Sequence, residues 1–143
     1  MIGLVVAAHG HLANELVHTA EQIVGKLSNI ESVSIEPGAA PEEIQEKLRA
    51  AVRRMDDGNG VIVLADLFGG TPCNQSLMLC TQTQSQLEVI TGVNLPMLLK
   101  AQSLRADSDM RLTDMAMGLA QYGQKNITCA TALLREGANA RTN

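Results

Sequence analysis

Unbroken runs of apolar residues mark two places where the chain is expected to be fully buried. Residues 1–8 form one run, which stops at His9, and residues 61–65 form another. Such runs are typical of strands buried on both faces, as in a parallel sheet that is covered by helices. Residues 32–36 instead alternate between apolar and polar side chains, which predicts a strand near the edge of the sheet. Residues 87–90 supply a shorter fourth strand.

Helical periodicity fills the segments between these strands. After the first strand, apolar side chains recur every three or four residues, which places them on one face of a helix. These positions are Leu12, Leu16, Ala20, Ile23, Val24 and Leu27. Similar patterns predict helices from Pro41 to Met55, from Thr71 to about Gln82, from Leu95 onward, and around Leu112 to Leu119.

Two of the predicted helices have recognisable starts. Pro41 fits a first helical position, and Glu42 and Glu43 suit the positive end of the helix dipole. Thr71 is a good N-cap, and Pro72 is a good first helical residue. The third helix is therefore expected to begin directly after a glycine-rich turn.

The alternation of strands and helices predicts an α/β fold, a three-layer sandwich around a mainly parallel sheet. We expect the strand order 2-1-3-4, in which the first and third strands are central neighbours. Residues 127–133 are expected to form a closing strand. Residues 1–135 would make up one domain, and the small and polar residues 136–143 a frayed, disordered tail.

Composition removes several classes of function. The net charge is -4, so a nucleic-acid binder held by bulk charge is not expected. The only aromatic side chains are Phe68 and Tyr122, which disfavours base stacking. The start of the chain lacks a basic leader, so we expect a cytoplasmic protein. Its three cysteines then read as reduced core thiols, at Cys73, Cys80 and Cys129.

The candidate chemistry lies at the ends of the two buried strands. In parallel sheets, ligands bind beyond the carboxyl ends of the strands, where successive crossovers leave for opposite faces. His9 and Asp66 occupy that place. Asp66 would accept the proton on Nδ1 of His9, which leaves Nε2 free to attack a phosphoryl group. Taken alone, each residue has a plainer role: His9 as a hydrogen-bonded structural residue, and Asp66 as a turn former.

Glycine-rich turns next to this pair favour an anion. Gly10 precedes one helix start, and Gly69, Gly70 and Thr71 precede another. Helix N-termini and bare backbone N–H groups bind phosphate oxygens. This scheme needs no metal and no cofactor.

Other chemistries find less support in the sequence. His11 could be imagined as a metal ligand beside His9, but residues two apart diverge on a helix and no further ligand follows at a familiar spacing. No phosphate-binding loop of the nucleotide hydrolases occurs. Phosphatases that form an aspartyl phosphate need a second acid two residues after the first, where this chain has Phe68.

Three motifs together resemble the mannose-type enzyme IIA domains of the bacterial sugar phosphotransferase system. They are Val6-Ala7-Ala8-His9-Gly10-His11-Leu12-Ala13, Asp66-Leu67-Phe68-Gly69-Gly70-Thr71-Pro72-Cys73-Asn74 and Gly92-Val93-Asn94-Leu95-Pro96-Met97-Leu98. The resemblance extends to about residue 135. The chain departs from it at Ala8, where a hydroxyl residue is common, at Asn14-Glu15, where a glycine is common, and at Leu67, where a polar residue is common.

The resemblance implies that His9 is the phosphorylated residue, that Asp66 is its partner, and that Thr71 with the Gly69-Gly70 backbone lines the phosphate pocket. It implies a histidine phosphocarrier protein as donor and an enzyme IIB as acceptor, which serves a membrane sugar permease. It further implies a homodimer in which the last strand, antiparallel at the sheet edge, can be exchanged. Nothing after residue 135 looks like a second domain, so the IIB partner is expected on a separate chain.

The sequence leaves more than one purpose open. The favoured interpretation is a phosphotransferase that carries a phosphoryl group for sugar uptake. A regulatory phosphocarrier without sugar transport would use the same histidine. A binding module for a small anion would use the same crevice without turnover. Service to a dihydroxyacetone kinase is less favoured by the Gly69-Gly70-Thr71-Pro72 turn.

Overall fold

The computed structural model describes residues 1–142 of the chain, and the side chains of residues 1–138. Its strands are β1 (Gly3–His9), β2 (Ile30–Ile35), β3 (Val61–Ala65) and β4 (Leu87–Thr91). Its helices are α1 (Leu12–Val24), α2 (Pro41–Met55), α3 (Thr71–Gln82), α4 (Leu95–Arg105), α5 (Leu112–Lys125) and α6 (Ala130–Thr142). None of the helices within residues 1–142 is both long enough and apolar enough to cross a membrane.

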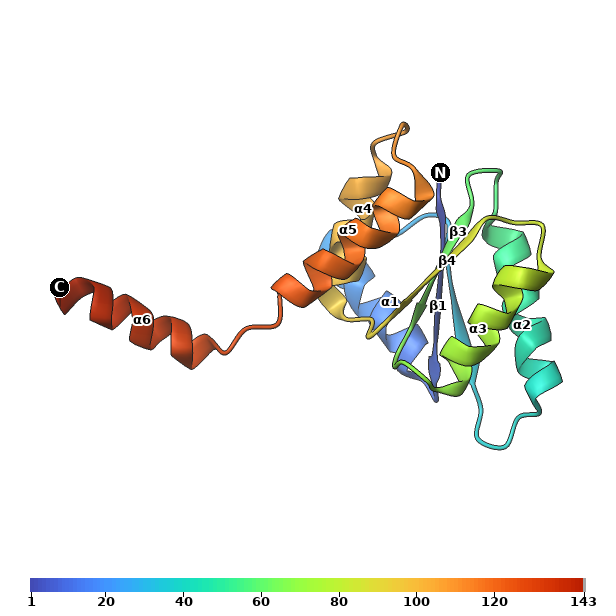
Figure 1. Cartoon of the computed structure of the whole chain (residues 1–143), viewed down its shortest axis with the longest axis horizontal. Helices are drawn as coiled ribbons and strands as arrows, with labels where there is room; N and C mark the ends of the chain where they lie inside the picture. Colours follow the sequence, from blue (N-terminus) through green and yellow to red (C-terminus); the bar gives the residue numbers. More distant parts are fainter. Residues whose placement is uncertain (143) are drawn as a thin grey trace.

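The strands form one parallel sheet in the order β2-β1-β3-β4, which confirms the predicted fold class and strand order. β1 pairs with β3 from Gly3 opposite Val61 to Ala7 opposite Ala65. β2 lies at one edge, as its alternating pattern predicts, and β4 lies at the other. Helices α1, α4 and α5 cover one face of the sheet, and α2 and α3 cover the other (Figure 1).

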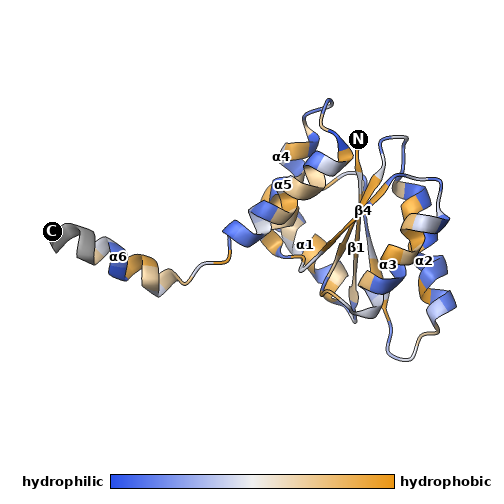
Figure 2. Ribbon diagram, viewed as in Figure 1, coloured by the Kyte–Doolittle hydropathy of each residue, from blue (hydrophilic) through white to orange (hydrophobic). Residues whose placement is uncertain are grey.

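The core is divided into two layers by the alternation of side chains along the central strands. In β1, Leu4, Val6 and Ala8 pack against α1, α4 and α5, whereas Val5 and Ala7 pack against α2. All five side chains are fully buried. On α2 the apolar side faces the sheet and the polar side faces outward (Figure 2). Burial on both faces explains why these strands read as unbroken apolar runs.

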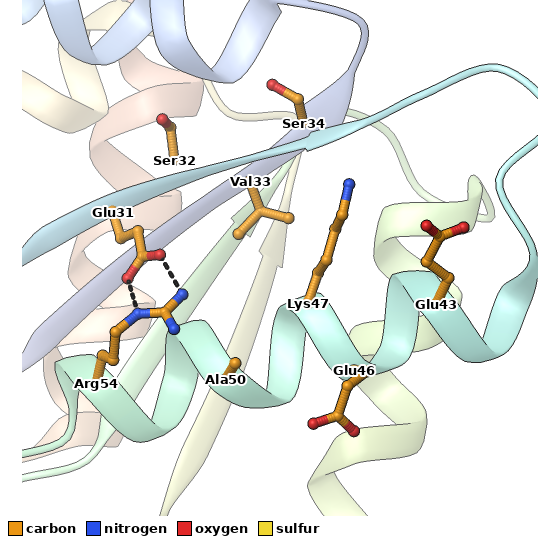
Figure 3. A pocket seen from close by; sticks show the side chains of 9 residues that line it. All are labelled: Glu31, Ser32, Val33, Ser34, Glu43, Glu46, Lys47, Ala50 and Arg54. Carbon is orange, nitrogen blue, oxygen red and sulfur yellow. Dashed lines mark hydrogen bonds and ion pairs between the residues drawn. The ribbon is translucent and has the colours of Figure 1, made fainter.

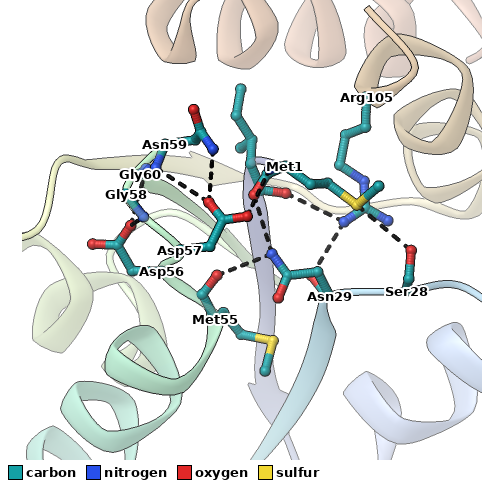
Figure 4. Close-up of polar contacts among 11 residues, drawn as sticks. Met1, Ser28, Asn29, Met55, Asp56, Asp57, Gly58, Asn59, Gly60 and Arg105 are labelled. Atoms are coloured by element: carbon teal, nitrogen blue, oxygen red, sulfur yellow. Dashed lines mark hydrogen bonds and ion pairs between the residues drawn. The ribbon is translucent and has the colours of Figure 1, made fainter. Parts of the chain in front are cut away.

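A polar network closes the end of the sheet where the strands begin (Figure 4). The buried Arg105 side chain donates to the carbonyl oxygens of Ile2 and Asn29. The Asn29 amide donates to the carbonyl oxygen of Met55. These bonds connect the last turn of α4 with the starts of β1 and β2 and the end of α2. The candidate residues His9 and Asp66 lie at the opposite end of the sheet, where β1 and β3 end.

The predicted closing strand over residues 127–133 is wrong for this structure. Residues 130–142 form α6, which extends away from the body of the molecule (Figure 1). Alanine, leucine, arginine and glutamate in this segment favour a helix, and a helix satisfies its own backbone hydrogen bonds without a neighbouring strand. The predicted tail is also helical from 136 to 142, and residue 143 lies outside the described residues.

Three smaller predictions also need correction. Gly70, and not Thr71, is the N-cap of α3, so Thr71 is its first helical residue. On α1 the buried side chains are Ala13 and Ala20, and the predicted apolar positions Leu12, Ile23 and Val24 are exposed. Cys73 is buried as expected, but Cys80 and Cys129 are exposed and are not core thiols.

Gly3 allows α2 to pack closely on the start of β1. A Cβ atom at this position would overlap the carbonyl oxygen and the Cβ of Met55. We expect Gly3→Ala to lower the free energy of unfolding by about 1–3 kcal/mol, because the backbone of α2 must move to accept the methyl group. Urea denaturation measures this change.

Gly118→Ala is the matched control, since the nearest atom to an added Cβ there is Leu104 Cδ1, at 3.8 Å. Gly118 lies inside α5, where alanine is the better helix former, so this variant should gain up to about 1 kcal/mol. Equal effects of the two substitutions would contradict the close packing at Gly3.

Candidate functional site

His9 and Asp66 meet because β1 and β3 are parallel neighbours in the sheet. His9 is the last residue of β1, and Asp66 follows the last residue of β3. The His9 Nδ1 atom lies 2.7 Å from Asp66 Oδ2. The pair proposed from the sequence is therefore a direct hydrogen bond at the carboxyl end of the sheet.

The carboxylate of Asp66 is held through both of its oxygen atoms. Oδ2 also accepts the backbone N–H of His9 at 3.1 Å, and Oδ1 accepts the N–H of Leu67 at 2.9 Å. Burial on its own would raise the pKa of Asp66. The hydrogen bonds from the His9 ring, from the His9 backbone and from Leu67, with the attraction of the His9 ring, outweigh burial and lower this pKa below 3.8. Asp66 is thus ionised at neutral pH.

The ionised carboxylate decides where the imidazole carries its proton. A carboxylate can only accept hydrogen bonds, so Nδ1 of His9 must be the donor. In the neutral ring, Nε2 then has a free lone pair. The His9 side chain is 50% exposed, whereas that of Asp66 is only 9% exposed. The arrangement is a half-exposed imidazole ring held in place by a nearly buried carboxylate.

The glycine turn before α3 lies against the imidazole ring. A Cβ atom at Gly70 would lie 3.3 Å from Cε1 of His9, so the N-cap of α3 adjoins the ring. Gly69 has a φ of +80°, a conformation that suits glycine. No side chain caps α3, so the N–H groups of its first turn at Thr71 and Cys73 have no capping acceptor. They form a positive helix end next to His9.

Asn74 supports this turn, and the sequence interpretation gave it no role. Its side-chain amide donates to the carbonyl oxygen of Gly69 at 3.1 Å, and its backbone N–H donates to that of Gly70 at 2.9 Å. Two bonds from the first turn of α3 therefore fix the glycine pair. An asparagine just after the start of a predicted helix was the available signal, since its amide can reach back to the preceding loop.

The backbone N–H of Gly10 differs from the free anion-binding group that the sequence suggested. Its N–H donates to the carbonyl oxygen of Ile35 at 3.1 Å, so this group already has an acceptor within the protein. Its φ of +58° turns the chain from β1 into α1. Gly10 shapes the site by its backbone and does not offer its own N–H to an anion.

Neither of the other two histidines takes part in the bond between His9 and Asp66. His11 is the exposed N-cap of α1 and makes no side-chain capping bond. His18 is exposed on α1, with Nε2 3.4 Å from the amide nitrogen of Gln22. Within the described part of the chain, no group of three or more His, Cys, Asp or Glu side chains is arranged to hold a metal ion.

A groove of about 670 Å³ between β2 and α2 is separate from this site (Figure 3). The side chains of Glu31 and Arg54 form an ion pair along it, and Lys47 extends across it from α2. None of its lining residues belongs to the His9 site. The site at His9 is recognised by its hydrogen bonds and not by the volume of a cavity.

Comparison with known families agrees with this geometry. The EIIA-man family model, described as "PTS system fructose IIA component", matches residues 3–117. The chain belongs to this family. It is an enzyme IIA domain of the mannose family and a component of a sugar phosphotransferase system.

Two relatives resemble most of this enzyme IIA domain. The chain is 30% identical over 131 residues to the mannose-specific EIIAB component of Escherichia coli (strain K12). The aligned residues make up 92% of this chain but only 40% of that relative. The chain is also 30% identical over 126 residues to the fructose-specific EIIA component of Bacillus subtilis (strain 168). This alignment covers 88% of this chain and 84% of that component.

A solved structure has the same fold as this domain. The mannose/sorbose-specific IIA subunit from Enterococcus faecalis superposes with a TM-score of 0.77 and 34% sequence identity. The match covers 89% of this chain and 92% of that subunit. The parallel sheet and its helices are therefore the family fold.

We expect nitrogen NMR of His9 to show the proton on Nδ1 in the neutral ring. In Asp66→Ala the acceptor is removed, so the proton should shift toward Nε2, the position that free imidazole favours. Spectra recorded at about pH 8, where histidine is normally neutral, distinguish the two forms. His18 in the same spectra is the internal control, and a proton on Nε2 of His9 in the wild type would contradict the proposed orientation.

Acid should weaken the fold partly through Asp66. Its pKa is lower in the folded protein than in the unfolded chain, so the ionised group stabilises the fold above the ordinary value of 3.8. That contribution is lost as the pH falls through the folded pKa. The difference in free energy of unfolding between the wild type and Asp66→Asn should therefore shrink as the pH falls below about 4. Urea titrations at several pH values measure it, and a constant difference would contradict the lowered pKa.

Proposed function

We propose that this enzyme IIA domain accepts a phosphoryl group on Nε2 of His9 and passes it to a second protein. The donor is a histidine phosphocarrier protein, and the acceptor is an enzyme IIB that serves a membrane sugar permease. The observation that carries the proposal is the hydrogen bond between Nδ1 of His9 and the ionised Asp66, which leaves Nε2 as a nucleophile on a half-exposed ring.

The transfer exchanges one phosphorus–nitrogen bond for another. The lone pair on Nε2 of His9 attacks the phosphorus atom of the donor's phosphohistidine. The donor's phosphorus–nitrogen bond breaks, and its electron pair stays on the donor imidazole. The proton on Nδ1 of His9 remains between the ring and Asp66, whose charge stabilises the positive charge that the ring gains. The same step with the acceptor's nucleophile in place of Nε2 unloads His9.

Support for the phosphoryl oxygens would come from the glycine turn and the start of α3. The first-turn N–H groups of Thr71 and Cys73 belong to the helix start that adjoins the His9 ring through Gly70. Asn74 holds the backbone of Gly69 and Gly70 in place. Backbone donors placed in advance stabilise the negative oxygens of a phosphoryl group during transfer. The half-buried Thr71 hydroxyl belongs to the same turn. The scheme uses only groups of this chain and its two partner proteins.

Labelling tests the proposal directly. The protein is incubated with radiolabelled phosphoenolpyruvate, enzyme I and the histidine phosphocarrier protein. We expect acid-labile, alkali-stable label on the wild type, none on His9→Ala, and undiminished label on His11→Ala. Asp66→Ala should be labelled about a hundredfold more slowly or worse, because its ring is no longer held in the reactive form.

His11→Ala is the matched control, since it removes a nearby exposed imidazole and leaves the His9–Asp66 pair in place. Label that persists in His9→Ala would move the chemistry to another residue. A wild type that takes no label from an active donor would overturn the carrier function. The anion-binding alternative would then be tested with inorganic phosphate.

A further inference from the structure

Arg105, the last residue of α4, is a buried cation without a carboxylate partner. It is only 8% exposed. Among residues 1–138, whose side chains the structure describes, no carboxylate forms an ion pair with it. Burial lowers the pKa of the guanidinium, because a cation loses favourable solvation when it leaves water. Arginine keeps its charge in proteins all the same. A buried charge of this kind is costly unless an anion neutralises it.

One edge of the Arg105 guanidinium makes no hydrogen bond. Nη1 makes both bonds of the group, to the carbonyl oxygens of Ile2 and Asn29 (Figure 4). Nε is buried and has no partner within the described residues. Nη2 has no partner among them either, but unlike Nε it is not fully buried. Nε and Nη2 together form the edge of a guanidinium that binds a carboxylate or phosphate group through two parallel bonds.

Arg54 shows this edge in use elsewhere in the molecule. Its Nε donates to Oε2 of Glu31, and its Nη2 donates to Oε1 of the same carboxylate (Figure 3). The Arg54 side chain is 58% exposed, so water could solvate it without a partner. Arg105 is buried, and its equivalent pair of donors meets no oxygen atom of the described chain. The need for an oxyanion is therefore greater at Arg105.

A pocket of about 350 Å³ adjoins this arginine at the end of the sheet where the strands begin. Its lining residues are Met1, Ile2, Asn59, Arg105, Asp107, Ser108 and Met110. The hydroxyl of the exposed Ser108 makes no hydrogen bond within the described residues, so it is a further available donor. Methionine side chains adapt their shape easily, so the pocket can adjust around a ligand. Its volume lies at the lower end of the range for small-molecule sites.

The other charges of the pocket leave Arg105 as its unpaired cation within the described residues. The amino group of Met1 is paired with Asp57 at 2.6 Å. Asp107 is exposed, and its Oδ1 accepts the backbone N–H of Asp109 at 3.0 Å. Asp107 forms no ion pair with Arg105, and its negative charge opposes the entry of an anion. This carboxylate therefore limits the affinity of the pocket for anions, which an experiment can measure.

We propose that this pocket binds the carboxylate or phosphate group of a small molecule, held by the Nε–Nη2 edge of Arg105 and by the Ser108 hydroxyl. The site lies beyond the start of β1, roughly 20 Å along the strand from His9. It is separate from the candidate chemistry, and the inference does not depend on the proposed function. The bound anion neutralises Arg105 and stabilises the junction of α4 with β1 and β2.

Nitrogen–proton NMR tests the site, with inorganic phosphate and acetate as separate probes. The side-chain Nε–H signal of Arg105 and the amide signals of Ser108 and Met110 report on the pocket. The amide signals of Gly70 and Thr71 report on the glycine turn before α3. Sodium chloride at matched ionic strength is the salt control. We expect saturable shifts of the pocket signals with a Kd on the order of 1–10 mM. Binding of phosphate alone would identify a phosphate ligand, and binding of acetate alone a carboxylate ligand.

Asp107→Asn and Asp109→Asn form a matched pair of variants. Each removes one negative charge from the same exposed loop, but only Asp107 lines the pocket. Asp107→Asn should lower the Kd about twofold to fivefold, whereas Asp109→Asn should change it by less than about 1.5-fold. Arg105→Lys keeps the charge but loses the two-donor edge, so its Kd should rise about tenfold or more. Ser108→Ala, at an exposed position, should raise the Kd about threefold even if Arg105→Lys disturbs the fold.

Four results would overturn the inference. One is the absence of a saturable shift at the pocket signals with either probe up to about 0.1 M. Shifts confined to Gly70 and Thr71 would assign the anion to the glycine turn and leave Arg105 a structural residue. Equal effects of Asp107→Asn and Asp109→Asn would show a response to net charge alone. An unchanged Kd in a folded Arg105→Lys would show that the guanidinium edge does not hold the anion.

Discussion

The parallel pairing of β1 with β3 is the constraint on which the site depends. It brings the last residue of one strand beside the first residue after the other, so the 2.7 Å bond between His9 and Asp66 follows from strand register. A shift of one residue would turn the alternate side chains of β1 toward the wrong core layer. The buried side chains of β1 and β3 on both faces of the sheet therefore fix the geometry of the polar pair at the ends of these strands.

Much of this arrangement could be predicted from the sequence, because its causes are local or topological. Unbroken apolar runs identified β1 and β3, and the crossover rules for parallel sheets placed His9 and Asp66 at one edge. The acceptor of the Gly10 N–H could not be predicted, since it depends on how far the β1–β2 ladder continues. The role of Asn74 depends in the same way on the path of a loop.

The errors have a common physical origin. Leu12 and Ile23 follow helical periodicity, yet α1 buries the face that carries Ala13 and Ala20, because small residues allow a helix to approach the sheet closely. Periodicity alone does not say which of two adjoining stripes faces inward. At 127–133 the apolar composition suits a strand or a helix, and the choice depends on whether a neighbouring strand is available. No local pattern carries that information.

The bond between His9 and Asp66 uses Nδ1, on the side of the nearly buried carboxylate, and does not involve Nε2. A phosphoryl group on Nε2 would therefore break none of the hydrogen bonds that position the ring. Loaded and empty forms would share one backbone and one core. They would differ in the local surface potential, which would become strongly negative next to the His9 ring once the phosphoryl group is bound. A partner could then distinguish the two forms by electrostatics alone, without any rearrangement of the fold.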